Sequence, residues 1–292
     1  MKIRNYLEYI PFIAFASLVR GLPRHVAMRF GRRMGSLARH LQPRRVRIAR
    51  ENLRQAFPEM PVSQREALLD NMFMHLGVSF VEMLRLDLYS GREDLERYFR
   101  FEGIEHLNEV LKLGRGGIVL SGHVGFWEAG AFFMPQLGVK AGFVAKPIRN
   151  PLVGGYFDRM RSAKGCYQIN SRKGARRIVK ALQSNHLVGI LIDQHTRPKE
   201  AVKVPFFGRP AHTTPVVARI AMKLQTPVLP CFVYRTDEDR YIVRFEPHIL
   251  LDPGSMSDED IVNNTTLLSG YIEQAVKREP SQWFWVHRRW RD

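Results

Sequence analysis

Several patterns that mark common enzyme classes are missing from this chain of 292 residues. It has no Walker A loop, no Gly-X-Gly-X-X-Gly fingerprint and no Gly-X-Ser-X-Gly elbow. A nucleotide-dependent enzyme or a serine hydrolase would therefore lack its usual parts. Cysteine is scarce too, since Cys166 and Cys231 are the only two, and no metal-binding spacing relates them. This usage favours a reducing, cytosol-facing compartment and argues against a zinc site.

Long hydrophobic runs are also lacking. The apolar and aromatic stretch Tyr6–Val19 is interrupted by Glu8 and Pro11, and it falls short of the roughly 20 residues that a membrane span requires. No small-residue cleavage site follows it, so we do not expect a removed signal peptide. We expect a helix that lies at the membrane interface or inserts shallowly. A buried core helix is the alternative.

Acidic residues are under-represented, with 28 against 45 basic residues and a net charge of +17. Between Arg20 and Arg50 there are ten arginines and no Asp or Glu. Five apolar residues recur there at helical spacing: Val26, Phe30, Met34, Leu37 and Leu41. The pattern predicts an amphipathic basic helix suited to an anionic bilayer, where each charge can contribute roughly 1 kcal/mol. A generally basic, soluble surface is the alternative.

The rest of the chain predicts an α/β fold. Residues 60–63 are expected to cap a helix that continues to about Leu86. Expected strands are 118–120, 142–145, 188–192, 228–234 and 241–246, and they alternate with helices over 126–134, 152–163, 171–183, 215–224 and 258–277, of which Ser171 and Ser257 cap the third and the last. This alternation predicts a central mixed, mostly parallel sheet flanked by helices. We divide the chain into an N-terminal, basic, membrane-anchoring helical region, 1–60, and an α/β domain, 61–292.

One motif combines a histidine with a carboxylate. The apolar run Ile118–Leu120 stops at Ser121-Gly122, His123 follows at once, and Glu128 comes five positions later. Within one helix the two side chains would stand about 140° apart and could not meet. They can meet if His123 lies in the loop after a strand and Glu128 in the first turn of the next helix. A carboxylate on one imidazole nitrogen leaves the other free to take a proton. A structural histidine is the alternative.

Other polar residues are placed where chemistry gathers in α/β folds. Asp193 and Gln194 follow the strand 188–192, so they are expected at the same sheet edge as His123. Arg159 and Arg161 end a predicted helix, where they either cap its last carbonyls or clamp an oxyanion or phosphate.

Two aromatic segments remain open at this point. Residues 205–214, with Phe206, Phe207 and Thr213, form either a packed loop or the lining of an apolar tunnel. The tail Trp283–Arg291 interleaves aromatic residues with cations, a pattern that suits a bilayer interface or the stacking of nucleic-acid bases.

Taken together, these segments resemble the bacterial lipid A late acyltransferases, the lauroyl/myristoyl transferases of the lysophospholipid acyltransferase superfamily. The resemblance runs through most of the chain: Glu51-Asn52-Leu53, Ala56-Phe57-Pro58, Gly103–Leu107, His123 to Glu128, Pro147, Asn150-Pro151-Leu152, Arg159–Ser162, Asp193-Gln194, Pro205–Gly208, Thr213-Thr214 and Trp285–Arg289.

This resemblance implies roles for individual residues. It makes His123 the general base and Glu128 its partner, and it places Arg161 near the reacting acyl group. The residues that it implies for substrate binding are Lys146, Arg149, Arg159, Asp193, Gln194, Phe206, Phe207 and Thr213. One departure concerns the acceptor head group, because Lys146-Pro147 stands where some relatives have Arg-Pro, with Arg149 nearby. Lysine keeps the charge but loses the bidentate fork.

The function implied is transfer of a fatty acyl chain from an acyl carrier protein thioester to a hydroxyl of a lipid A precursor. The expected partners are acyl carrier protein, an anionic phosphorylated glycolipid acceptor and inner-membrane lipids, at the cytoplasmic face of the inner membrane. We expect no metal, no organic cofactor and no nucleic acid. Another lysophospholipid or glycolipid acceptor is the nearest alternative, and a basic nucleic-acid-binding protein is the remote one. Acyl chain length and acyl-CoA as donor stay open.

Overall fold

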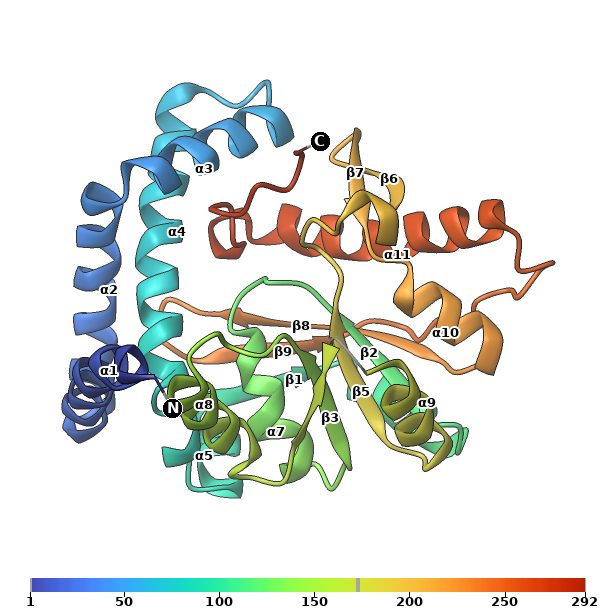
Figure 1. Cartoon of the computed structure of the whole chain (residues 1–292), viewed down its shortest axis with the longest axis horizontal. Coiled ribbons are helices and arrows are strands. Elements are labelled where there is room, and N and C mark those ends of the chain that lie inside the picture. Colours follow the sequence, from blue (N-terminus) through green and yellow to red (C-terminus); the bar gives the residue numbers. More distant parts are fainter. Residues whose placement is uncertain (1, 172–173, 292) are drawn as a thin grey trace.

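A seven-stranded sheet organises the part of the chain that the computed structural model describes, residues 2–171 and 174–291 (Figure 1). Its order is β1-β9-β8-β2-β5-β3-β4. The bounds are β1 Phe99–Glu102, β2 Gly117–Ser121, β3 Ala141–Ala145, β4 Tyr167–Asn170, β5 Leu187–Leu191, β8 Val228–Arg235 and β9 Tyr241–Phe245. Strands β8 and β9 pair antiparallel and the other neighbours pair in parallel. The predicted mixed, mostly parallel sheet is confirmed.

Side chains of the central strand alternate between two hydrophobic layers. Ile118 and Leu120 of β2 pack with helices α9 (Ala175–Gln183), α10 (Val216–Leu224) and α11 (Asp258–Arg278). Val119, on the other face, packs with α5 (Arg92–Tyr98), α6 (Ile104–Lys112) and α7 (Gly130–Gln136). Because successive side chains of a strand point to opposite faces, this short apolar run is buried on both sides.

The N-terminal region is helical, as predicted, but it is divided. Helices α1 (Ile3–Gly21), α2 (Arg24–Leu41) and α3 (Pro43–Ala56) replace the single basic helix expected over residues 20–50. The breaks fall at Pro23 and Pro43, because proline disfavours helical geometry in the residue before it. Helix α2 packs along α4 (Val62–Met83) so closely that a Cβ on Gly77 would collide with the backbone oxygen of Gly31. The predicted domain boundary near residue 60 therefore separates two helices, α2 and α4, that pack closely against each other.

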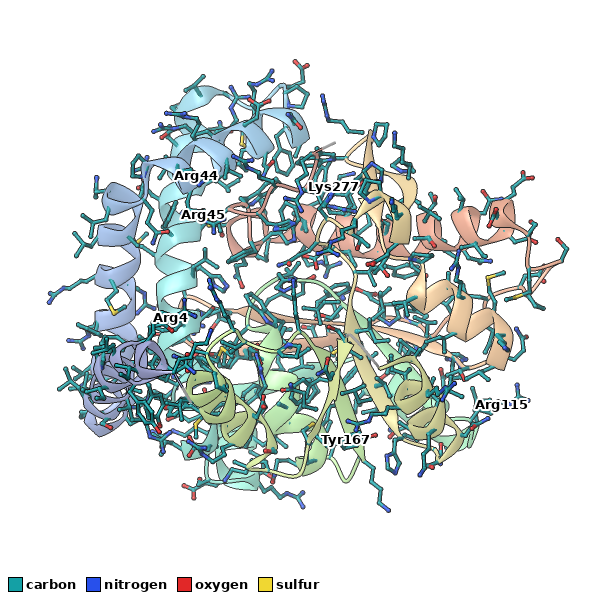
Figure 2. All side chains as sticks on the ribbon, in the orientation of Figure 1. Arg4, Arg44, Arg45, Arg115, Tyr167 and Lys277 are labelled. Carbon is teal, nitrogen blue, oxygen red and sulfur yellow. The ribbon has the colours of Figure 1, made fainter. Side chains whose placement is uncertain are left out.

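The fold supplies acidic partners that the arginine-rich stretch itself lacks. Five of its ten arginines, at 20, 24, 32, 39 and 50, pair with carboxylates of α4, of the segment that follows it and of the turn between β8 and β9. Arg24 lies 2.6 Å from Glu82, for example. Arg44, by contrast, is exposed on α3, on the opposite side of the view from Arg115 (Figure 2). Half of the arginines between residues 20 and 50 therefore form ion pairs that link parts of the fold.

Helix α1 has one face packed against the protein and another face that exposes apolar side chains. Its inner face packs on α8 (Pro151–Ser162) through Phe12, whose ring lies 5.1 Å from that of Tyr156. Its outer face exposes four large apolar side chains: Ile3, Leu7, Ile10 and Leu18. Within residues 2–171 and 174–291, no helix is both long enough and apolar enough to cross a membrane.

Several elements differ from the sequence-based expectation. The segment 205–214 is not a loop but most of a hairpin, β6 (Val202–Phe206) and β7 (Arg209–Thr213). Its two turn residues, Phe207 and Gly208, both have positive φ, as a tight hairpin turn requires. Phenylalanine is uncommon in that conformation, so the sequence did not indicate a turn there. Helix α9 follows Gly174, so Ser171 is not its cap. The predicted Ser257 cap of α11 is confirmed. Strands β1 and β4 and helices α5 and α6 were not predicted.

Candidate active site

His123 lies just beyond β2, at the carboxyl edge of the sheet, where the chain turns sharply. Gly125 makes this turn possible. It has φ +62°, and a side chain there would collide with the carbonyl oxygen of Val233. Its N–H donates to the carbonyl oxygen of Gln282 at 2.8 Å. His75 of α4 donates from Nε2 to the Gly125 carbonyl at 3.1 Å. The loop is thus held from three other parts of the chain.

The imidazole of His123 is held by Asp193, which follows β5. Nδ1 lies 2.8 Å from Oδ1 of Asp193, and the His123 backbone N–H donates to Oδ2 at 2.8 Å. An ionised carboxylate only accepts, so Nδ1 carries the proton and Nε2 keeps its lone pair. Within the described residues, Nε2 has no hydrogen-bond partner. Nε2 is therefore the atom that can act as a base.

The Asp193 carboxylate stays ionised although its side chain is only 1% exposed. Burial alone would raise its pKa. Electrostatic attraction to the His123 ring and the hydrogen bonds from His123 and Trp283 outweigh burial and hold the pKa of Asp193 at about 2.

Glu128 has a different partner from the one expected. It lies in a short 3₁₀ turn, Trp127–Ala129, and its two oxygens accept from Nε and Nη2 of Arg161, each at 2.7 Å. The predicted bond between Glu128 and His123 is therefore wrong. Strand register explains why Asp193 replaces it. Ser121 pairs with Leu191 across β2 and β5, so the residues two positions beyond each strand emerge side by side.

An apolar cavity of about 410 Å³ opens beside this pair. It lies on the α7 face of the sheet, and β2, β3, β5 and β8 contribute apolar or small residues to its wall, such as Val119, Phe143 and Val233. The charged and larger polar residues of its lining lie where β2, β3 and β5 end and on the helices beyond, and they are His123, Glu128, Lys146, Arg161 and Gln194. The site therefore combines a base and a cationic group with a space for an apolar chain.

Three side chains along this cavity that could act as nucleophiles are not activated. Cys166 and Cys231 both line it, and burial raises the pKa of Cys166 to about 12 and raises that of Cys231 as well. The hydroxyl of Ser121 donates to the Cys231 carbonyl oxygen at 2.7 Å. These contacts favour attack by a second substrate over an acyl-enzyme intermediate.

Comparison with known proteins gives the family. A model of the bacterial lipid A biosynthesis acyltransferase family matches residues 2–292. The chain belongs to this family. Similar proteins from Escherichia coli (strain K12) include a lipid A biosynthesis lauroyltransferase, 28% identical over 94% of this chain and 88% of that protein. A palmitoleoyltransferase is 28% identical over 92% and 86%, and a myristoyltransferase 23% identical over 87% and 77%.

The family description supports acyl transfer in lipid A biosynthesis. The three relatives are named for three different acyl groups, so membership does not fix the acyl chain. In this acyltransferase the residues expected to bind substrate separate into groups. Lys146 and Gln194 line the cavity. Arg149 and Arg159 are exposed outside its lining.

The aromatic hairpin residues are placed elsewhere. Phe206 and Thr213 are fully buried and Phe207 is partly buried, and none of the three lines the cavity. Phe206 instead packs against Trp283, with ring centroids 5.5 Å apart. Of the two alternatives for residues 205–214, the contacts favour a packed segment, because Phe206 lies against the buried ring of Trp283.

The C-terminal tail is part of the site, which sequence reasoning missed. Trp283, Trp285 and Arg289 are fully buried rather than exposed to lipid or nucleic acid. Phe284 N–H donates to the carbonyl oxygen of His123 at 3.1 Å, and Trp283 Nε1 donates to Oδ2 of Asp193 at 2.8 Å. Tryptophans at alternate positions are a pattern of a half-buried extended segment, and this was the available clue.

Stability should fall as the pH drops from 7 to 4. Burial, and then the charge of Arg235, lowers the pKa of His75 to about 3, and burial lowers that of His287 to about 4. Unfolded histidines titrate near pH 6.5. Below that pH the unfolded chain binds protons that the folded chain does not, so each group removes up to about 1.4 kcal/mol of stability per pH unit. Denaturant unfolding in detergent at pH 4.5–7.5 measures this slope.

His75→Gln isolates one of these groups, because glutamine can still donate to Gly125 without titrating. The variant should show a shallower loss of stability between pH 6.5 and 4.5 than the unmodified protein. Equal slopes in the two proteins would show that His75 titrates normally and would contradict the effect of its burial.

Proposed function

We propose that this acyltransferase moves a fatty acyl chain from an acyl carrier protein thioester to a hydroxyl group of a lipid A precursor. The observation that supports this most is the pairing of His123 Nδ1 with buried Asp193, which leaves Nε2 unpaired beside an apolar cavity. The cavity suits an acyl chain, and the base suits a hydroxyl acceptor.

The reaction follows from the roles of these atoms. Nε2 of His123 takes the proton of the acceptor hydroxyl as its oxygen attacks the thioester carbonyl carbon. The tetrahedral intermediate then collapses, the carbon–sulfur bond breaks, and the imidazolium returns its proton to the departing thiolate. The products are an ester and a thiol. Asp193 stabilises the imidazolium that forms between these steps.

Arg161 is the candidate for stabilising the oxyanion. Burial would lower its pKa, but the hydrogen bonds to Glu128 raise it overall, so the group stays charged. Glu128 engages Nε and Nη2, and Nη1 makes no hydrogen bond within the described chain. Nη1 is thus free to donate to developing negative charge. Lys146 at the cavity, with exposed Arg149 and Arg159, would attract the phosphates of the acceptor.

The proposal also covers the identities of the acyl donor and of the acceptor head group. A net charge of +17 favours an acidic carrier protein as the donor, with acyl-CoA as the alternative. The nucleic-acid alternative has lost one support, because the aromatic tail that would stack on bases is buried.

Substitutions in the site separate the roles of the two carboxylates. His123→Ala should lower kcat at least about 10²-fold, the usual scale for a lost general base. Asp193→Asn should have an effect of similar size, because it removes the group that fixes the tautomer. Acyl transfer to a lipid A precursor in detergent, followed by mass spectrometry, measures both.

Glu128→Gln is the matched variant, since it also neutralises one carboxylate. It should act through Arg161, so the Glu128→Gln, Arg161→Ala double variant should lose no more than the larger single loss. Near-normal turnover of Asp193→Asn together with a His123-like loss in Glu128→Gln would reverse the assignment.

Gly189 offers a test of the acyl cavity. It lines the cavity from β5, and a Cβ there would meet no atom closer than 3.7 Å. Gly189→Leu should therefore extend into the cavity and shift the preferred donor to shorter chains. Each excluded methylene costs about 0.8 kcal/mol, roughly fourfold in kcat/KM.

The measurement is kcat/KM across a series of donor chain lengths. Gly270→Leu is the control, because that glycine lies on α11 and an added Cβ would meet no atom within 4 Å. An unchanged chain-length profile for folded Gly189→Leu would place the acyl chain elsewhere.

We further propose that α1 attaches the protein to the cytoplasmic face of the inner membrane. Ile3, Leu7 and Ile10 are 79%, 67% and 60% exposed on one face of the helix. Exposed arginines of α2 and α3 add a second, electrostatic contribution, and stable attachment generally needs two.

Leu7→Ser with Ile10→Ser should convert detergent-requiring attachment into attachment that moderate salt releases, because only the screened charges remain. Leu250→Ser with Leu267→Ser is the control, since these residues are also exposed but lie outside α1. Membrane flotation with salt and detergent washes measures the difference. If the unmodified protein already washes off in salt and binds single-stranded nucleic acid as tightly as anionic vesicles, the membrane proposal is wrong.

A further inference from the structure

We propose that Trp283 is a positioning residue that fixes the orientation and ionisation of the His123–Asp193 pair. The inference rests on the proposed function, because it assigns to Trp283 an effect on catalysis exerted through Asp193. Trp283 itself is fully buried and does not line the cavity, so it has no contact with the reacting groups.

The geometry divides the carboxylate of Asp193 between two tasks. Oδ1 accepts from the ring of His123, while Oδ2 accepts from the His123 backbone N–H and from Trp283 Nε1. The two donors on Oδ2 prevent the carboxylate from rotating away from the imidazole. Because the Asp193 side chain is 1% exposed, water is poorly placed to replace a donor that is removed.

The indole is delivered by a segment that is tied to the same loop. Val124 and Trp283 form an antiparallel bridge, flanked by the bonds from Gly125 N–H to Gln282 and from Phe284 N–H to His123. The Gln282 side chain bonds both backbone groups of Arg235 on β8. The tail therefore acts as a short extra strand, and the position of the Trp283 indole is fixed by backbone pairing.

Trp285 provides a matched comparison within the same segment. It is equally buried, and its ring packs at right angles to that of Trp283 with centroids 4.5 Å apart. Its indole N–H donates to the Pro280 carbonyl oxygen at 2.6 Å rather than to the active site. Replacing either tryptophan by phenylalanine thus removes one indole hydrogen bond and a similar volume, but only Trp283→Phe removes a donor to Asp193.

The experiment compares Trp283→Phe with Trp285→Phe in the full-length protein, using an acyl-thioester donor and a lipid A precursor. For Trp283→Phe we expect kcat to fall about tenfold to a hundredfold, the range for a lost hydrogen bond to a charged group. KM should change by less than about twofold, because no substrate contact is removed. The acid limb of the pH–rate profile should move to higher pH, since the pair takes up a proton more readily. Trp285→Phe should match the unmodified protein in all three.

A double variant separates an effect exerted through Asp193 from a general loss of folded protein. Asp193→Asn with Trp283→Phe should lose no more activity than Asp193→Asn alone, whereas independent effects would multiply. If folded Trp283→Phe matches Trp285→Phe in kcat and pH profile while His123→Ala and Asp193→Asn are inactive, the positioning role is wrong and the proposed function stands. If His123→Ala and Asp193→Asn remain active, the proposed function itself fails.

Discussion

The Asp193 carboxylate is the constraint on which the rest of the site depends. A buried charge of this kind is costly unless every oxygen is well paired, and here the loop after β2 and the C-terminal tail supply the partners. Segments separated by more than half of the chain must therefore fold together before His123 has its orientation. This explains why the tail is buried.

The sequence predicted the fold around the site better than the side-chain contacts within it. Alternation of apolar runs and helical patterns placed His123 and Asp193 at one sheet edge. It could not show that β2 and β5 are neighbours, because strand order is a long-range property. Glu128 is nearer to His123 along the chain and was therefore preferred as its partner. Strand register reverses that choice by bringing Asp193 beside the imidazole.

The roles of the charged and aromatic segments were similarly ambiguous from the sequence alone. The arginines between residues 20 and 50 suggested a free basic surface, but half of them pair with carboxylates from distant segments. The tail Trp283–Arg291 suggested an exposed interface, but three of its largest side chains are fully buried. In both segments the physical role depends on partners that composition cannot reveal. The exposed apolar face of α1 is the part of the predicted membrane region that the packing leaves available.

The central claim is that Asp193, not Glu128, fixes the tautomer of His123, and nitrogen NMR of ¹⁵N-histidine-labelled protein in detergent tests it most directly. The account predicts a protonated Nδ1 and an unprotonated Nε2 for His123 at neutral pH, with the Nδ1 proton shifted downfield by its bond to the carboxylate. This signature should be lost in Asp193→Asn and kept in Glu128→Gln. A His123 signal that is protonated on Nε2, or that changes in Glu128→Gln and not in Asp193→Asn, would contradict the account.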